Sequence, residues 1–391
     1  MTTDRLKKRV CKEVERQRDA LVRLSLLIHA NPELGFQEVQ ATGWLTDYLE
    51  SNGFRVARGV AGLPTAFTAS YGSGSPVIGI LAEYDALPKL GHACGHNLIG
   101  TSAVGAGVAL KSVIDGVGGK VVVLGTPAEE LHGGKAIMAE RGIFNDLDAA
   151  MIAHPGVRDT ATSWALACIG LDIEFFGKAS HAAARPDDGI NALEAMIQSF
   201  NSINSLRQHI RDKARVHGII TDGGEAANIV PSHSAGYFLV RAEDDDYLQR
   251  LRLRVLDCFK GAAQATGARL EYRWAEVKYA AMRSNESLAE LFSKNMESLG
   301  RKTVPRDPNR GMGSTDMGNV SVLVPSIHPS VAIAPTTVLG HSTEFAQAAA
   351  SPEGQKGLLD AAKAMAMTAV DLLAKPETMA RVRDEFLRGE V

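Results

Sequence analysis

Three short apolar segments, separated by stretches with helical spacing, constrain the fold of this chain more than any other feature. They are PVIGILAEY (76–84), KVVVLGTP (120–127) and AAMIAHPG (149–156). Between the first two, the segment LIGTSAVGAGVALKSVI is typical of a helix. Short apolar runs bounded by turn residues indicate buried strands, and strands that alternate with helices form a mostly parallel sheet. The predicted fold class is therefore α/β, with helices flanking a mostly parallel central sheet.

Helices are also predicted at both ends of the chain. The apolar residues of the opening segment recur at helical spacing: Val10, Val14, Leu21, Leu24 and Ile28. This pattern stops at Asn31-Pro32, because proline disfavours helix in the residue before it. A closing helical run, GQKGLLDAAKAMAMTAVDLLA, follows loops rich in proline and glycine.

The sequence pattern changes near residue 165. Segments 167–183, 216–224 and 234–244 alternate like strands, and 190–211 and 244–265 have helical spacing. Their order is β-α-β-β-α-β, which is typical of a small α+β domain. Since 391 residues exceed the usual size of one core, we predict a catalytic domain (1–166 and 283–391) interrupted by an inserted lid or dimerisation domain (167–282).

Composition narrows the class of partner. A net charge of −3 and a pI near 6.4 argue against nucleic acid or an anionic membrane as partner, so a small-molecule substrate is expected. The four cysteines lie far apart, unlike a secreted disulfide framework. The charged amino-terminal segment has no apolar core that would mark a signal peptide or anchor. We therefore expect a cytoplasmic protein.

The segment GHACGH (91–96) places His92, Cys94 and His96 within five positions. With 11 His and 4 Cys in the chain, random placement would give this spacing in roughly 0.003 of such chains. Histidine and cysteine are ligands of zinc and related metals. The alternatives are a loop histidine that caps a helix and a cysteine that packs as a small apolar residue.

Two further strand ends carry residues that can bind a metal. TPAEELHGG supplies Glu129, Glu130 and His132, and IAHPG supplies His154. Ligand sites in open α/β sheets lie at the carboxyl ends of strands, so these side chains are expected to meet. Adjacent glutamates cannot project in the same direction, so the pair suits two tasks: one carboxylate binds the metal and the other interacts with the water on that metal. A solvated pair at a helix start is the alternative.

Competing enzyme signatures are missing from the sequence. It contains no G-x-S-x-G nucleophile motif, no G-x-x-x-x-G-K-[ST] phosphate loop, no G-x-G-x-x-G that opens a helix, and no H-x-E with P-C-x-x-C deaminase pattern. Metal-dependent hydrolysis is therefore the reaction class that the motifs favour.

Taken together, the motifs resemble the aminoacylase and carboxypeptidase family of co-catalytic metallopeptidases. AEYDALP, GHACGHN, TPAEE, AHPG, GKASHAA, NIVP and GHS occur in the family's order and span nearly the whole chain. HACGH is similar to the motif of the amidohydrolase branch. AEYDALP with GSTDMGNVS looks closest to the group of aminobenzoyl-glutamate hydrolases and β-alanyl-lysine dipeptidases within that branch.

The resemblance implies a set of metal ligands, which are Cys94, His96, Glu130, His154 and His341. It implies that Glu129 is the general base. In the GHS context, His341 is preferred over His328 as the last ligand, and His92 is not expected to be a ligand.

One position departs from the pattern of other branches. A histidine there stands two residues before Asp85, whereas this chain has Glu83, so a metal contact at this position is not assumed. Asp85 is expected to orient a ligand rather than bind metal.

The chemistry of the implied site is that of two divalent metal ions. Two adjacent ions can bind water, polarise an amide carbonyl and stabilise both oxygens of the tetrahedral intermediate. Glu129 can take the proton of the water and pass it to the leaving amine. A thiolate from Cys94 favours zinc, although manganese or cobalt also suits the carboxylate and imidazoles.

The inserted domain contributes three candidate residues. The resemblance gives His181 the stabilisation of the oxyanion, often across a dimer interface, and gives Asn228 and Arg241 the carboxylate of the substrate. An arginine fork can bind a carboxylate with two hydrogen bonds. The alternatives are a solvent-facing arginine on a strand and a turn asparagine. The Gly-rich segment 311–321 is expected to be a loop that lines the pocket.

The sequence therefore predicts a metal-dependent amidohydrolase that cleaves the amide bond of an N-acyl amino acid or dipeptide-like compound. The alternative within enzymes is an exopeptidase, a dipeptidase or carboxypeptidase, on ordinary peptides. The alternative outside enzymes is a non-catalytic metal-binding relative, which would have no need of Glu129. A homodimer is expected from the resemblance.

Overall fold

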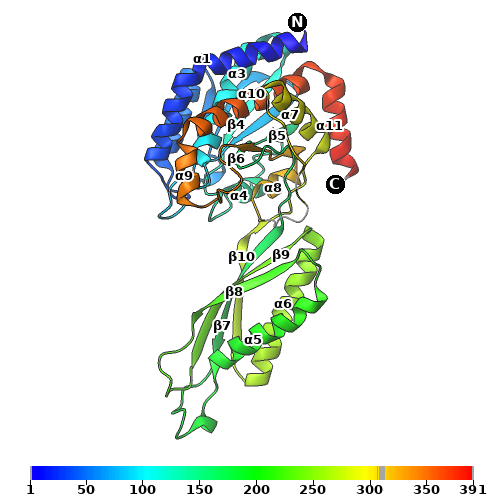
Figure 1. Ribbon diagram of the computed structural model, residues 1–391. Helices are drawn as coiled ribbons and strands as arrows, with labels where there is room; N and C mark the ends of the chain where they lie inside the picture. The colour runs from blue at the N-terminus through cyan, green and yellow to red at the C-terminus, as the bar shows by residue number, and fades with distance from the viewer. Residues whose placement is uncertain (1, 306, 308–312, 390–391) are drawn as a thin grey trace. The chain divides into compact units, whose positions relative to one another are not determined.

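A six-stranded sheet with strand order β1-β2-β4-β3-β5-β11 lies at the centre of the first of two structural units (Figure 1). Its strands are β1 (Arg55–Arg58), β2 (Phe67–Ser73), β3 (Val77–Ala82), β4 (Gly119–Gly125), β5 (Ala149–Met151) and β11 (Ser326–Ile327). β3 pairs in parallel with β4 and β5, and β5 pairs in parallel with β11, whereas the pairs β1–β2 and β2–β4 are antiparallel. The predicted α/β class with a mostly parallel sheet is confirmed.

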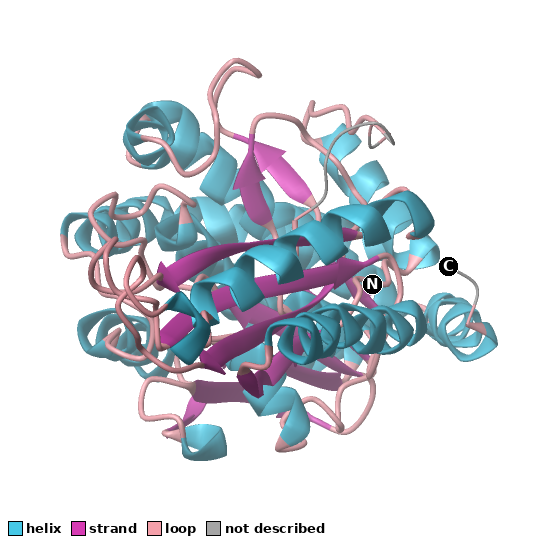
Figure 2. Cartoon of the chain, turned by 90° about the horizontal axis from the view of Figure 1, so that it is seen from below, coloured by secondary structure: helices cyan, strands magenta, loops and turns pink. Residues whose placement is uncertain are grey.

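Helices flank this sheet, and Figure 2 distinguishes the helices and strands of the chain by colour. They are α1 (Thr3–Ala30), α2 (Val39–Ser51), α3 (His96–Val117), α4 (Gly134–Glu140), α7 (Glu286–Ser298), α8 (Met317–Ser321), α9 (Thr343–Ala349), α10 (Pro352–Ala374) and α11 (Pro376–Arg388). The apolar side chains of α1, α3 and α10 belong to one core with those of the strands. α3 is long and apolar enough to cross a membrane, but 89% of its apolar window is buried inside the protein, as in the core helix of a globular unit.

The opening helix follows the predicted pattern. Val10, Val14, Leu21 and Ile28 are fully buried, and α1 ends at Ala30, one residue before Asn31-Pro32. Leu21 packs where a side chain on Gly105 of α3 would stand, since a Cβ there would lie 2.8 Å from Leu21 Cδ1. The small residue therefore lets α1 and α3 approach closely.

The segment 149–156 was predicted as one strand, and this prediction is wrong. It forms two short strands in different sheets, because β6 (His154–Gly156) leaves the central sheet and pairs in parallel with β12 (Ser330–Ala332). Pro155 has no N–H to continue a ladder. This change of partner separates His154 from the strand that precedes it.

The second unit contains a four-stranded antiparallel sheet with strand order β10-β7-β9-β8. Its strands are β7 (Ala167–Phe176), β8 (Arg215–Asp222), β9 (His233–Ala242) and β10 (Arg269–Tyr279), and its helices are α5 (Ala192–Leu206) and α6 (Asp245–Thr266). The two helices pack against the sheet around a separate core (Figure 1). The chain order β7-α5-β8-β9-α6-β10 is the predicted β-α-β-β-α-β order.

The computed structural model describes residues 2–305, 307 and 313–389. Within them, the second unit is Ala165–Ala281 with the described part of Met312–Thr315, and the rest of the chain forms the first unit. Residues 313–315 were predicted to belong with the first domain. They belong to the second because Leu166 N donates to Gly313 O at 2.8 Å, and Arg241 Nη1 donates to Ser314 Oγ at 2.9 Å.

Candidate metal centre and active site

Residues from four separate segments form one cluster of potential metal donors in the first unit. Three groups have donor atoms that all lie within 4.8 Å of one another: Cys94, His96 and His154; Cys94, Glu130 and His341; and His96, Glu129 and Glu130. The groups overlap, and Cys94 belongs to two of them. A donor set that shares one thiol between two neighbouring groups suits two adjacent metal ions rather than one.

The glycine in GHACGH allows the two ligands that flank it to meet the rest of the cluster. Gly95 has φ +80° and precedes α3, so the loop turns sharply into the helix. A Cβ at this position would lie 2.5 Å from Pro155 Cγ. Glycine therefore permits Cys94 and His96 to lie against the segment that carries His154.

Hydrogen bonds orient the two buried histidines for metal binding. His96 Nδ1 lies 2.8 Å from Asp85 Oδ1, and His154 Nδ1 lies 2.7 Å from Pro155 O, so each Nδ1–H donates to an oxygen. This tautomer leaves the lone pair of each Nε2 available. Cys94 Sγ lies 3.3 Å from His154 Nε2. In the described part of the chain, His96 Nε2 is buried without a hydrogen-bond partner, so it is available to bind a metal ion.

Asp85 connects two of the candidate ligands, because its Oδ2 also accepts from Glu130 N at 3.0 Å. Burial alone would raise the pKa of Asp85, but attraction to His96 and the hydrogen bond from its ring outweigh burial and lower the pKa. The ionised carboxylate therefore holds the His96 ring and the Glu130 backbone together, the arrangement expected of a residue that orients ligands.

The loop that carries Glu129 and Glu130 is held in an unusual backbone conformation. Ala128 has φ +59°, and its N–H donates to Glu38 Oε1 at 2.8 Å. A Cβ on Gly134 would lie 1.8 Å from Pro127 O, so only glycine fits where the loop closes. Strained backbone conformations that are held in place by the surrounding structure are common at active sites. Glu38 is fully buried, and burial raises its pKa to about 7.

The electrostatics of the cluster fit bound cations. Burial, followed by repulsion from Glu83 and Asp316, raises the pKa of Glu129 well above its ordinary value. Burial also raises the pKa of the Cys94 thiol. Glu130 Oε1 is a second buried atom that has no hydrogen-bond partner within the described residues. Divalent cations would relieve this repulsion and stabilise the Cys94 thiolate, so the donors present fit two metal ions.

Three further histidines were considered from the sequence. His341 Nε2 lies 3.5 Å from Glu130 Oε1, and its backbone has φ +59°. His328 lies outside the three donor groups with its ring centroid 5.4 Å from that of His154, and burial lowers its pKa to about 3. His92 also lies outside these groups, and burial lowers its pKa to about 3. The geometry therefore favours His341 over His328 as a donor.

Two buried residues that the sequence analysis did not single out, Lys135 and Asp316, lie beside the cluster. Lys135 Nζ lies 2.6 Å from Glu83 Oε1 and 2.7 Å from Asp316 Oδ1. Burial alone would raise the pKa of Glu83, but attraction to Lys135 and His96 lowers it to about 2. A lysine between two glycines and an apolar segment resembles an ordinary surface residue, so the sequence carried no signal for this ion-pair network.

The candidate residues of the second unit do not all come together. His181 and Asn228 are exposed neighbours, since Ala182 N donates to Asn228 O at 3.0 Å and His181 pairs with Ile229 as a β-bridge. Arg241 lies at the other end of β9, eight residues beyond His233, a separation of about 27 Å along a strand. One copy of this unit therefore cannot direct all three side chains to one small substrate.

The expected Gly-rich loop is partly helical. Residues 317–321 form α8, which Asp316 precedes. Gly311 and Met312, the first two residues of the segment, lie outside the described residues.

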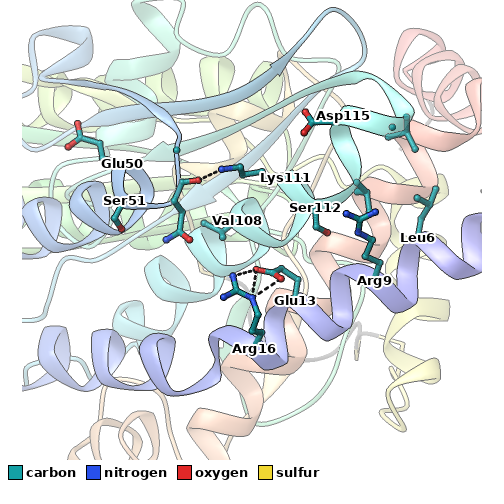
Figure 3. A pocket seen from close by; sticks show the side chains of 15 residues that line it. Leu6, Arg9, Glu13, Arg16, Glu50, Ser51, Val108, Lys111, Ser112 and Asp115 are labelled. Atoms are coloured by element: carbon teal, nitrogen blue, oxygen red, sulfur yellow. Dashed lines mark hydrogen bonds and ion pairs between the residues drawn. The ribbon is translucent and has the colours of Figure 1, made fainter.

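A pocket of about 420 Å³ opens beside the donor cluster. Its lining includes Cys94, His154 and His341, together with Arg158 and Trp164. A pocket of about 670 Å³ lies elsewhere, between α1, the end of α2 and α3 (Figure 3). Figure 3 shows Arg16 directed at Glu13, and Lys111 donating to a backbone oxygen, that of Asn52 at 2.7 Å. The lining of this larger pocket contains none of the candidate metal donors. The smaller pocket is therefore the candidate site for substrate binding.

An α/β sheet with thiol, imidazole and carboxylate donors clustered at the ends of its strands is the architecture of a metallohydrolase. The chain belongs to Peptidase family M20/M25/M40, whose model matches residues 79–366. The predicted family is thus confirmed, and so is the reaction class, metal-dependent hydrolysis of an amide or peptide bond.

Relatives with assigned names share much of the sequence. The chain is 39% identical to the Xaa-Arg dipeptidase of Mus musculus over 397 residues, which cover 97% of this chain and 92% of that protein. It is 38% identical to a p-aminobenzoyl-glutamate hydrolase subunit of Escherichia coli K12 over 285 residues, which cover 67% of this chain and 59% of that subunit.

Solved structures share the fold. A dinuclear metal-binding peptidase of the M20 family from Bacillus subtilis matches with a TM-score of 0.70 and 22% identity, covering 92% of this chain and 99% of that one. An aminobenzoyl-glutamate utilization protein from Klebsiella pneumoniae matches with a TM-score of 0.72 and 18% identity, covering 92% and 97% of the two chains.

Proposed function

We propose that this protein hydrolyses the amide bond of a dipeptide or N-acyl amino acid and releases an amino acid with a free carboxylate. The observation that carries the proposal is the set of overlapping donor groups around Cys94, with Glu129 in one of them. Relatives named as an Xaa-Arg dipeptidase and as a p-aminobenzoyl-glutamate hydrolase, at 39% and 38% identity, support this substrate class.

The proposed metal ligands are Cys94, His96, Glu130, His154 and His341. Two divalent ions held by these residues would polarise the amide carbonyl and bring the pKa of a water towards about 7. We propose zinc because Cys94 is a soft donor, with manganese or cobalt as alternatives.

Glu129 is the proposed general base. It belongs to the donor group of His96 and Glu130, so its carboxylate lies where it could accept a proton from a metal-bound water and return it to the leaving amine. Its neighbour Glu130 is directed at His341, so the two glutamates divide the two tasks.

We propose that the protein acts as a homodimer in which His181 and Asn228 reach the site of the partner copy. The separation of about 27 Å along β9 between their end of the sheet and Arg241 supports this arrangement. The edge strand β8 supports it too, because Ile219 and Ile220 are 63% and 41% exposed there.

A mixing experiment tests the partner's contribution. His181→Ala and Glu129→Gln chains, each inactive alone, are mixed and allowed to exchange subunits. If His181 acts across the interface, mixed dimers have one intact site, and about a quarter of the wild-type activity returns for random exchange. If His181 acts within its own chain, no activity returns.

The four cysteines are free in the structure, which supports the further proposal of a reducing, cytoplasmic location. We expect neither nucleic acid nor membrane as partner.

The substrate class is tested with metal-loaded protein and a panel of Xaa-Arg dipeptides, p-aminobenzoyl-glutamate, N-acyl amino acids and longer peptides, with released amine as readout. Turnover of dipeptides or acyl amino acids but not of longer peptides is expected, since the 420 Å³ pocket beside the donors is small. Faster cleavage of longer peptides would favour the exopeptidase alternative. Bound metal without turnover of any compound would favour a non-catalytic relative.

A further inference from the structure

Lys135 is fully buried, although lysine is rarely buried without a partner. Two bonds fix its position: Nζ lies 2.7 Å from Asp316 Oδ1, and its own backbone N–H donates to Asp316 Oδ2 at 2.8 Å. Because both ends of Lys135 are tied to one carboxylate, the ammonium cannot move away from the cluster. It is held 2.6 Å from Glu83 Oε1.

Glu83 stands between this ammonium and a candidate metal ligand. It directly follows β3 and is fully buried. Its Oε2 lies 3.4 Å from His96 Nε2, the nitrogen that the bond from Nδ1 to Asp85 leaves available. A carboxylate oxygen so close to a ligating nitrogen can reach the same metal ion, and carboxylates bind zinc and manganese well. The ammonium and the metal therefore compete for Glu83.

We propose that Lys135 controls the coordination of the metal ion bound by His96, because its ion pair with Glu83 keeps this carboxylate from becoming an additional ligand. The inference rests on the donor cluster of the proposed function. A catalytic metal needs a position open to water or substrate. A further anionic ligand would fill that position, so Lys135 is a positioning residue that acts through Glu83.

The geometry of Asp316 strengthens this assignment. Both of its oxygens accept hydrogen bonds from Lys135, so its charge is fully engaged. Asp316 orients the ammonium, and Lys135 Nζ forms an ion pair with Glu83 Oε1 at 2.6 Å. The three buried charged side chains thus lie in a row, in the order Asp316, Lys135 and Glu83. Glu83 Oε2, at the end of this row, lies 3.4 Å from His96 Nε2.

Cobalt binding tests the proposal without reference to activity. Apo protein is titrated with Co²⁺ in the presence of a competing chelator, and the visible absorption of the bound ion reports its coordination number. For Lys135→Met, we expect about tenfold tighter binding, since an anionic ligand is added, and weaker visible bands, since the coordination number rises. For the double variant Lys135→Met/Glu83→Gln, both values should return to those of wild type.

Lys111→Met is the matched control. Lys111 is partly buried and donates to a backbone oxygen, that of Asn52, but it lies in the pocket of Figure 3, away from the donors. We expect no change in cobalt affinity or spectrum. Wild-type binding by Lys135→Met, or altered binding that Glu83→Gln does not reverse, would overturn the proposal.

A single variant decides the question if Lys135→Met fails to fold. Glu83→Gln keeps the shape of the side chain and removes the competing charge. It should bind two cobalt ions with the wild-type visible spectrum, and an altered spectrum would show that Glu83 is itself a ligand and refute the inference. A wild-type protein that binds no cobalt refutes the donor cluster itself, whereas two bound ions with discordant variants refute only the role of Lys135.

Discussion

Replacing Asp85 by Asn should weaken metal binding without disturbing any ligand directly. The carboxylate accepts from His96 Nδ1 at 2.8 Å and from Glu130 N at 3.0 Å. An amide has one acceptor oxygen, so its NH₂ group must face one of these two donors. The variant therefore loses one charge-assisted hydrogen bond, about 1.5–3 kcal/mol, and misaligns one of two ligands.

The expected loss of metal affinity is about 10- to 100-fold, or about 1.4–2.7 kcal/mol, the usual effect of removing a partner of a ligating histidine. The assay is Zn²⁺ competition between the protein and a chelator, with the free energy of unfolding of the apo protein measured in parallel. The same loss should appear as a lower metal content after dialysis.

Asp148→Asn is the matched control, since Asp148 also accepts from a backbone N–H, that of Val77 at 2.7 Å, at the opposite end of β3. It should cost stability but leave zinc affinity unchanged. Wild-type affinity in Asp85→Asn, or an equal loss in Asp148→Asn, would refute the reasoning that Asp85 acts by orienting His96 and Glu130.

Three other perturbations have defined outcomes. His341→Asn should release one of two metal ions in a metal-content measurement, whereas His328→Asn should keep both; the reverse result would exchange their assignments. Gly95→Ala should lower metal content because its Cβ would lie 2.5 Å from Pro155 at φ +80°. Gly116→Ala, inside α3 and with open space around it, should keep the metal and raise the melting temperature slightly; equal behaviour of the two would contradict the packing argument. Hydrogen bonds from His233 to Asp222 and Glu174 raise the pKa of His233. The stabilising effect of these bonds is therefore fully present below the unfolded pKa of about 6.5 and is lost as pH rises through the folded pKa. The difference in unfolding free energy between wild type and His233→Gln should shrink from pH 6 to pH 9, and a constant difference would exclude this ion-pair effect.

The architecture was accessible from sequence because periodicity and burial are local properties. The apolar runs at 76–84 and 120–127 correctly predicted β3 and β4, and the helical spacing of the first thirty residues correctly predicted α1. The split of 149–156 into β5 and β6 was missed because an apolar run does not reveal a change of partner. Pro155, which cannot donate to a ladder, was the one available signal.

The clustering of donors was expected for a topological reason, since the carboxyl ends of neighbouring parallel strands meet at one edge. Glu38, Lys135 and Asp316 could not be found in this way. Each acts through contacts between segments far apart in the chain, such as the bond from Ala128 N to Glu38 and the ion pair between Lys135 and Asp316. A buried charge of this kind has the same local sequence context as a solvated one.

The separation of Arg241 from His181 and Asn228 was equally invisible in the motifs. Their order in the sequence agrees with the family, but antiparallel pairing of β7 and β9 places them at opposite ends of one sheet. Sequence order alone cannot state which copy of the chain completes a site.

The most direct test of the central claim compares wild type, Glu129→Gln and Glu140→Gln for metal content and for release of amine from the substrate panel. Glu140, exposed at the end of α4, controls for the loss of a carboxylate. We predict two bound ions in all three proteins, wild-type turnover in Glu140→Gln, and a loss of about 10²- to 10⁴-fold in kcat for Glu129→Gln, the usual contribution of a general base. Unchanged turnover in Glu129→Gln with both ions bound would contradict the account.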